Sequence, residues 1–457
     1  MCLDSREKTV GGRDILFSQT LVELHLNIIS VTQSRLWQNV VLVSSALINI
    51  SIYIIIAHAL STQLFGSYLF AQWLVIATIP VIGTGMSTLA SRQIAITQSQ
   101  ETPQLIAGIF YFLWYRQLRS ILLYCLIYLC VALALTKIFD DNTPEILLFS
   151  SLATLPLLLS NIAGTTLRSL RRSDLLTMLH LFGNLLTLLF IIIATQFKCG
   201  SVAIFIFAFA FSNTLTLMLA IVCVVCLLPL KQTRAPGIFL RERLVRHIQY
   251  SRLHVALDAV VWQRSELLLL ACWHNTRELG FYALSSIISA KVMNIAPALF
   301  SQWIFPLMKR YYPASRFMNQ YEAFVRTSCY IIFLAVPISM GMIILCPNIL
   351  SLTLGNDYLP VVKPLRILLI AAVFGSIATV SLTHIANDQH YDKSSLQRIQ
   401  RHLMIGVVGL KILLAIPLII LWGMTGAALA SALAQITSAL ISILLCKTLL
   451  MRPHTLS

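Results

Sequence analysis

The sequence predicts an all-α membrane protein of about twelve transmembrane helices. Hydrophobic residues make up 58% of the 457 residues and charged residues only 11%, whereas a soluble domain is about 45–50% apolar and about 25% charged. The apolar residues also gather in blocks of about 18 or more, long enough to cross the ~30 Å hydrocarbon layer as helices. These two observations exclude a water-soluble core.

Twelve such blocks follow one another, separated by short breaks. Polar or glycine-containing stretches at 140–142, 198–200 and 355–357 mark the clearest boundaries, because such residues end apolar helices. The predicted spans are 37–60, 69–90, 118–138, 145–167, 175–195, 201–229, 253–273, 281–305, 328–350, 364–386, 402–422 and 425–447.

The spans divide into two halves of six. We expect a cytoplasmic N-terminal extension at 1–36, a first half at 37–230, a basic cytoplasmic linker at 231–252, a second half at 253–447 and a cytoplasmic tail at 448–457. The extension lacks the ordered regions of a signal peptide. It fits an interfacial helix or a start codon assigned too early, and the sequence leaves both open.

The distribution of Lys and Arg predicts the orientation. With the N-terminus in the cytoplasm, the cytoplasmic segments hold 25 of the 33 Lys and Arg and the outer segments only five. This bias is what the positive-inside rule requires. It also accounts for the net charge of +16, since the cations are spread over every inner loop and face anionic lipid. A nucleic-acid partner is therefore not expected, and both termini are predicted to be cytoplasmic.

A weak internal repeat supports the division into halves. The stretch Thr62–Tyr68, TQLFGSY, follows the first span, and Thr276–Tyr282, TRELGFY, follows the seventh. Both are expected in the first outer loop of their half. Glycine turns at Gly200 and Gly423 open the last span of each half. Because six spans return the chain to the same side, the halves should be related by a pseudo-two-fold axis along the membrane normal, with a cavity between them.

Ionisable residues inside apolar spans are the candidate functional residues. At mid-membrane each costs about 2.5–3.5 kcal/mol on insertion scales, so such residues usually face a water-filled space or a partner charge. The seventh span contains three of them together with a tryptophan, the eighth and eleventh contain one each, and one ends the fourth: Asp258, Trp262, Arg264 and Glu266, then Lys291, Lys411 and Arg168.

We expect these residues to line a polar cavity between the halves, called the lumen below. Asp258, Trp262 and Glu266 are four residues apart and share one helix face, whereas Arg264 and Glu266 point about 200° apart. Cations in the lumen would attract a pyrophosphate or an acidic sugar. The acids would pair with these cations or carry H⁺ or Na⁺. The structural alternative is that the charges pair between helices and never touch substrate.

Three short motifs follow one another in the first half. They are Phe65-Gly66-Ser67-Tyr68, Gly83-Thr84-Gly85 and Arg92-Gln93-Ile94-Ala95. In this order they resemble the opening signature of bacterial polysaccharide transporters, the O-antigen and exopolysaccharide flippases of the multidrug/oligosaccharidyl-lipid/polysaccharide (MOP) exporter superfamily.

The second half extends the resemblance to about residues 37–447. Its elements are Arg264-Ser265-Glu266 followed by four leucines, Glu278-Leu279-Gly280-Phe281-Tyr282, Pro306, Gly355-Asn356-Asp357-Tyr358, Leu365-Arg366-Ile367-Leu368 and Gly423 to Ala428. Two features depart from the family pattern. Leu267 stands where members often have Arg directly after the acid, and members commonly have fourteen spans.

The resemblance implies a flippase of the bacterial inner membrane. It would carry undecaprenyl-pyrophosphate-linked oligosaccharide to the outer face by alternating access through a cationic lumen, beside the polysaccharide polymerase and chain-length machinery. We expect no cofactor other than a coupling ion, H⁺ or Na⁺.

Three alternatives remain. A small-molecule exporter of the multidrug and toxin extrusion type should carry an acid in its first helix, and the first span has none. A polymerase or ligase needs a long outer loop, and these outer loops are short, so an enzyme is not expected. A non-transporting scaffold is the third alternative. The glycan, the coupling ion and the oligomeric state are left open.

Overall fold

The computed structural model describes most of the predicted helical region, and all structural statements below refer to that part. The described residues are 40–41, 43–82, 94, 103–135, 143–170, 172–196, 201–228, 237–238, 241–242, 244–245, 265–273, 276–300, 320–387 and 393–450. The N-terminal extension, most of the basic linker and the larger part of the predicted seventh span lie outside them.

Helices account for nearly all of this part of the chain, as the composition predicted. They are Val43–Ala59, α2 (Thr62–Ile82), α4 (Pro103–Leu135), α5 (Thr143–Ser169), α6 (Ser173–Gln196), α7 (Val202–Leu227), α9 (Glu266–Trp273), α10 (Thr276–Leu299), α12 (Gln320–Thr353), the 3-10 helix η2 (Asn356–Val361), α13 (Val362–Asn387) and α14 (Lys393–Leu450).

Six stretches within the described residues are long and apolar enough to span a membrane. They have a mean hydropathy of 1.3 to 2.6 and comprise 174–196, 202–227, 276–299, 324–353, 356–381 and 402–448. The last is a pair of helices, because Gly423 has a non-helical backbone with φ 53° and ψ −129°. A positive φ suits glycine, which lacks a Cβ. The glycine turn predicted between the last two spans is thereby confirmed.

Several predicted helix starts were wrong in an informative way. Helix α2 begins at Thr62 rather than at residue 69, so the repeat stretch Thr62–Tyr68 forms its first two turns instead of a loop. The second copy likewise begins α10. Helix α4 begins at Pro103 rather than 118, although Arg116 and Arg119 lie within it. Hydropathy marks only the apolar part of a helix, and these helices extend beyond it.

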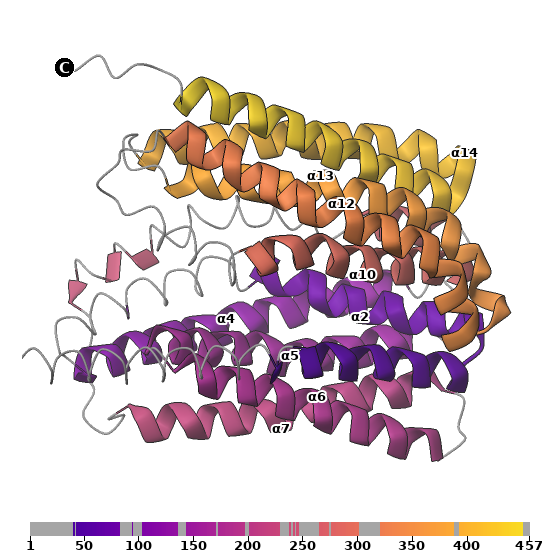
Figure 1. Cartoon of the computed structure of the whole chain (residues 1–457). Coiled ribbons are helices and arrows are strands. Elements are labelled where there is room, and N and C mark those ends of the chain that lie inside the picture. The colour runs from indigo at the N-terminus through magenta and orange to yellow at the C-terminus, as the bar shows by residue number, and fades with distance from the viewer. Residues whose placement is uncertain are drawn as a thin grey trace, which may run out of the picture.

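The helices pack in two groups. Helices α2, α4, α5, α6 and α7 pack on one another, as do α9, α10, α12, α13 and α14, and α2 against α10 joins the groups. Figure 1 shows α2 and α10 side by side in the middle of the molecule, with α4 to α7 on one side and α12 to α14 on the other. Helices α10 and α13 are 61% buried over their most apolar stretch, against 22–33% for the other four candidate spans. The latter therefore expose more of their apolar surface, as helices that face lipid do.

A glycine pair brings α2 and α10 together. A Cβ on Gly66 would overlap the carbonyl oxygen of Thr276 and lie 3.2 Å from the Cα of Gly280, while a Cβ on Gly280 would meet the backbone of Gly66 and approach the carbonyl oxygen of Thr62 at 3.8 Å. Small residues allow helix backbones this close inside a membrane, where dispersion contacts replace the hydrophobic effect as the cause of association. The two copies of the repeat therefore meet each other at this crossing.

We predict that Gly66→Ala destabilises the protein. The added methyl group must push α2 away from α10, and overpacking of this kind costs about 1–3 kcal/mol. Thermal unfolding of the purified protein in detergent should show a lower Tm than wild type. Gly341→Ala in α12 is the matched control, because nothing lies within 4 Å of its Cβ and alanine favours a helix by about 1 kcal/mol. Equal Tm values for the two variants would contradict the close packing.

Candidate functional site

A buried ion pair joins two of the four charged spans that the sequence singled out. The Nζ of Lys411 in α14 lies 3.0 Å from the Oε2 of Glu266, the first residue of α9, and the two side chains are 1% and 0% exposed. Both residues belong to the predicted lumen set. In this structure they face each other and are covered, so a role in substrate binding stays a prediction.

The pair is costly to break. Removing one member of a buried pair leaves an uncompensated charge and typically costs about 3–5 kcal/mol. Neither carboxylate oxygen of Glu266 has a hydrogen-bond partner among the described residues, so the ammonium group of Lys411 is the main compensation shown for this charge. The interaction ties α9 to α14, two helices that also pack directly.

The remaining candidates differ in their surroundings. Lys291 lies just past the middle of α10 and is exposed. Asn294, three residues later on the same helix face, is also exposed. Arg168 is exposed in the last turn of α5. Asp258, Trp262 and Arg264 lie outside the described residues. A cation that stays exposed within an apolar helix suits a water-filled space, which is the environment predicted for Lys291.

An aromatic cluster closes the end of the molecule where α2 and α10 begin. The ring of Tyr358 in η2 meets Phe65 edge-on at 5.8 Å and Phe281 at 6.0 Å. Its hydroxyl donates a hydrogen bond of 3.3 Å to the carbonyl oxygen of Ala57. Edge-to-face aromatic pairs add about 0.5–1.5 kcal/mol each beyond their buried area. Together with the glycine pair, this cluster holds the two helix groups in contact at the Thr62/Thr276 end.

Glu278, from the second copy of the repeat, reaches the kink in α14. Its Oε2 accepts a 3.3 Å hydrogen bond from the backbone N–H of Met424, directly after Gly423. The first N–H groups of a helix lack partners within the helix, and a carboxylate there is favourable. The family-like motif Glu278–Tyr282 thus has a structural role: it caps the last helix and packs against α2.

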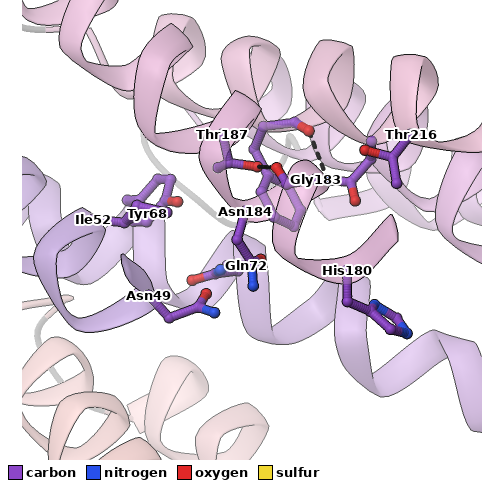
Figure 2. Close-up of a pocket in the computed structure, with 11 residues that line it drawn as sticks. Asn49, Ile52, Tyr68, Gln72, His180, Gly183, Asn184, Thr187 and Thr216 are labelled. Carbon is purple, nitrogen blue, oxygen red and sulfur yellow. Dashed lines mark hydrogen bonds between the residues drawn. The ribbon is translucent and has the colours of Figure 1, made fainter. Parts of the chain in front are cut away.

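A polar pocket lies within the first helix group and was missed by the sequence analysis. Its open volume, mouth included, is about 450 Å³, and Figure 2 shows the side chains that surround it. The lining residues are Asn49, Ile52, Tyr68, Gln72, His180, Gly183, Asn184, Thr187, Phe209, Asn213 and Thr216. The search for ionisable residues passed over it because four of these are neutral amides. The sequence did contain a signal for this pocket, namely a neutral amide residue in each of four apolar spans.

We predict that Lys411→Met lowers the free energy of unfolding by about 3–5 kcal/mol, because it leaves the Glu266 carboxylate buried without its cation. The double variant Glu266→Gln with Lys411→Met should recover most of the loss, since it removes both charges. Thermal unfolding of the four proteins of this double-mutant cycle measures the coupling. Additive losses would show that the two charges do not interact.

Comparison with known proteins supports the resemblance seen in the sequence. The family model described as "Polysaccharide biosynthesis protein" matches residues 92–363, which is more than half of the chain. No curated protein sequence matches.

Solved structures share the fold at low sequence identity. The lipid II flippase MurJ in an inward closed conformation has a TM-score of 0.67 at 13% identity, covering 90% of this chain and 87% of that chain. A multidrug resistance MATE transporter of the MOP superfamily has a TM-score of 0.66 in its inward-facing conformation, at 11% identity with 89% and 94% covered. An outward-facing MATE transporter of the same superfamily scores 0.58 at 13% identity, with 91% and 94% covered.

The matched region contains the repeat stretch Thr276–Tyr282, Glu266 and the Gly355–Tyr358 element, all of which lie at the helix contacts described above. The fold is shared with solved membrane transporters. The chain belongs to the family described as "Polysaccharide biosynthesis protein".

Proposed function

We propose that this protein is a flippase that moves lipid-linked oligosaccharide, of the undecaprenyl-pyrophosphate type, from the cytoplasmic to the outer face of the bacterial inner membrane. The observation that carries the proposal is the combination of a polysaccharide biosynthesis family with the fold of membrane transporters. A glycan assembled on a lipid at one face must cross the bilayer before it is used at the other, and a polar glycan cannot cross hydrocarbon without a protein path.

Under the orientation predicted from the Lys and Arg distribution, we assign this structure to a state of an alternating-access cycle that is closed on the outer side. With both termini cytoplasmic, the Thr62/Thr276 end faces outward. The glycine pair and the aromatic cluster of Tyr358 hold that end closed. This agrees with the higher similarity to inward-facing relatives, 0.66 against 0.58 for the outward-facing form. Outward opening then requires α2 and α10 to separate at the outer end.

The lumen supplies the charge for the pyrophosphate. Lys291 is exposed in the membrane-spanning part of α10, and Arg264 is predicted in the neighbouring span. An ammonium or guanidinium group binds phosphate oxygens through charge-assisted hydrogen bonds. The pair of Glu266 with Lys411 would couple transport to H⁺ or Na⁺ if the cation or the acid changes partner during the cycle.

A second candidate function is ion-coupled export of small molecules. The observation that favours it is the similarity to a multidrug resistance MATE transporter, with a TM-score close to that of MurJ. Such an exporter would alter drug sensitivity without affecting glycan intermediates, so one experiment separates the two candidates.

We predict that a strain without this protein accumulates lipid-linked oligosaccharide on the cytoplasmic face. Accessibility of the glycan to a membrane-impermeant lectin or oxidant in spheroplasts and in inverted vesicles measures the sidedness. Wild-type protein should restore export, and Arg264→Ala should not, because the pyrophosphate loses a cation. Arg241→Ala is the matched control: Arg241 lies over the Phe112 ring at 5.4 Å outside the predicted lumen, and its loss should leave export intact. Normal sidedness without the protein would move the small-molecule exporter to the front.

We predict that a cross-link between α2 and α10 at their outer ends stops transport. Thr62→Cys with Thr276→Cys, in a background where the ten native cysteines are replaced, places one thiol on each helix next to the glycine pair. A short bifunctional maleimide linked through a reducible bond should trap the closed end and block export, and reduction should restore it. Each single-cysteine protein, treated identically, is the control. Full transport by the cross-linked protein would mean that this end never opens.

A further inference from the structure

The pocket in the first helix group lies at mid-membrane depth. Asn184 occupies the middle of α6, a 24-residue helix, and Asn213 the middle of α7, a 26-residue helix. Asn49 lies near the centre of Val43–Ala59. Transporters of related architecture bind substrate near the bilayer midplane, where the walls are irregular enough to hold a polar ligand. The pocket is therefore at the depth where a passing polar group needs protein contacts.

Its walls carry hydrogen-bonding groups without formal charge. None of the lining residues is Asp, Glu, Lys or Arg, and the ionisable members are the exposed His180 and the buried Tyr68. Figure 2 shows the amide groups of Asn49, Gln72 and Asn184 directed toward the same space from three helices. A phosphate or an acidic sugar would find no cation here, so charge does not select the ligand of this pocket.

Three of the amides use one N–H each within the first helix group. The Nδ2 of Asn49 donates to the carbonyl oxygen of Ser45 at 2.9 Å, and the Nδ2 of Asn213 donates to that of Phe209 at 2.7 Å. The Nδ2 of Asn184 donates to the hydroxyl of Ser45. Each of these amides has a second N–H and a carbonyl oxygen for a ligand that both donates and accepts hydrogen bonds, as a hydroxyl group does.

Two polar atoms of the pocket have no partner in the described part of the chain. They are the hydroxyl of Tyr68, whose side chain is 1% exposed, and the Oε1 of Gln72. Buried polar atoms are nearly always hydrogen-bonded, and an exception calls for an explanation. The Gln72 amide already hydrogen-bonds the Tyr53 side chain, so the Tyr68 hydroxyl is the exception that a ligand in the pocket would satisfy.

A glycine keeps the walls close together. A Cβ on Gly183 would lie 2.8 Å from the Oγ1 of Thr216, so α6 and α7 are in backbone-to-side-chain contact here. The hydroxyl of Thr187 bonds the Ser212 hydroxyl at 2.7 Å across the same interface. The polar groups of α6 and α7 are therefore fixed by packing, as a binding site requires.

We propose that this pocket binds a neutral sugar residue of the transported glycan. Sugar hydroxyls both donate and accept hydrogen bonds and so match these amides, and the half-buried Phe209 ring in the wall offers apolar surface to the C–H side of a pyranose. This assignment rests on the proposed function: the pyrophosphate would lie at the cationic lumen while an uncharged sugar occupies this pocket.

The test is saturation-transfer difference NMR on the purified full-length protein in detergent. The probes are the methyl glycosides of glucose, galactose and N-acetylglucosamine, with methyl glucuronide as the charged comparison. Wild type should transfer saturation to at least one neutral glycoside and more weakly to the glucuronide. Asn213→Leu and Thr216→Val should weaken this binding about tenfold.

Thr214→Val is the matched control for Thr216→Val. Both threonines lie in α7, both are half-buried and both bond a backbone carbonyl four residues earlier, at 2.8 Å and 2.9 Å, but Thr214 is outside the pocket. Thermal unfolding of each variant separates a local effect from a folding defect, and the near-isosteric Thr216→Val keeps the test decisive if Asn213→Leu does not fold.

Three outcomes would overturn the proposal. They are no transfer to any neutral glycoside in wild type, transfer that both pocket variants leave unchanged, and a sodium-dependent rise in Tm that disappears in Asn213→Leu, which would assign the pocket to a cation. The outcome is independent of the export assay. Glycoside binding without cytoplasmic accumulation in the deletion strain would overturn the flippase and keep the sugar pocket, and accumulation without binding would do the reverse.

Discussion

The contact between α2 and α10 is the constraint on which the arrangement of the two helix groups depends. Inside a bilayer, apolar surface gains nothing by leaving lipid, so helices stay together through close packing and polar contacts. Gly66 and Gly280 supply the close packing, since neither position leaves room for a methyl group. The aromatic cluster around Tyr358 then forms where both helices begin. Any motion that separates α2 from α10 at the Thr62/Thr276 end must undo these contacts together.

Polar and charged groups within the spans fall into three environments. Glu266 and Lys411 are covered and paired across two helices. Lys291 is exposed on α10, although α10 and α13 are the most buried of the candidate spans. The amides of the pocket are neutral and bond partly to their own helices. The spans therefore contain paired charges, an exposed cation and a neutral polar pocket in separate places.

Hydropathy was sufficient to predict the helical fold but not how its helices meet. Predicted spans at 175–195 and 201–229 match α6 and α7 within two residues, because these helices are apolar throughout. The start of α2 was missed because TQLFGSY contains polar residues and glycine, although its repetition at Thr276 was visible. Glu266 and Lys411 were both selected as charges in spans, but their pairing is a tertiary contact over 145 positions that one sequence does not encode locally. The neutral amides were missed because insertion cost falls mainly on formal charge.

The glycine contact has the form of an interface between identical partners. Gly66 approaches Thr276 as Gly280 approaches Thr62, which is the reciprocal pattern of an isologous two-fold dimer. If a six-helix chain paired with a second copy of itself through one glycine, that one sequence position would make the contact on both sides of the interface. In one fused chain the two copies can vary independently, and the flanking residues differ. Ser67 corresponds to Phe281, which meets Tyr358. Leu64 corresponds to Glu278, which caps the last helix. Fusion thus lets one half acquire contacts that a symmetric dimer would have to make on both sides or not at all.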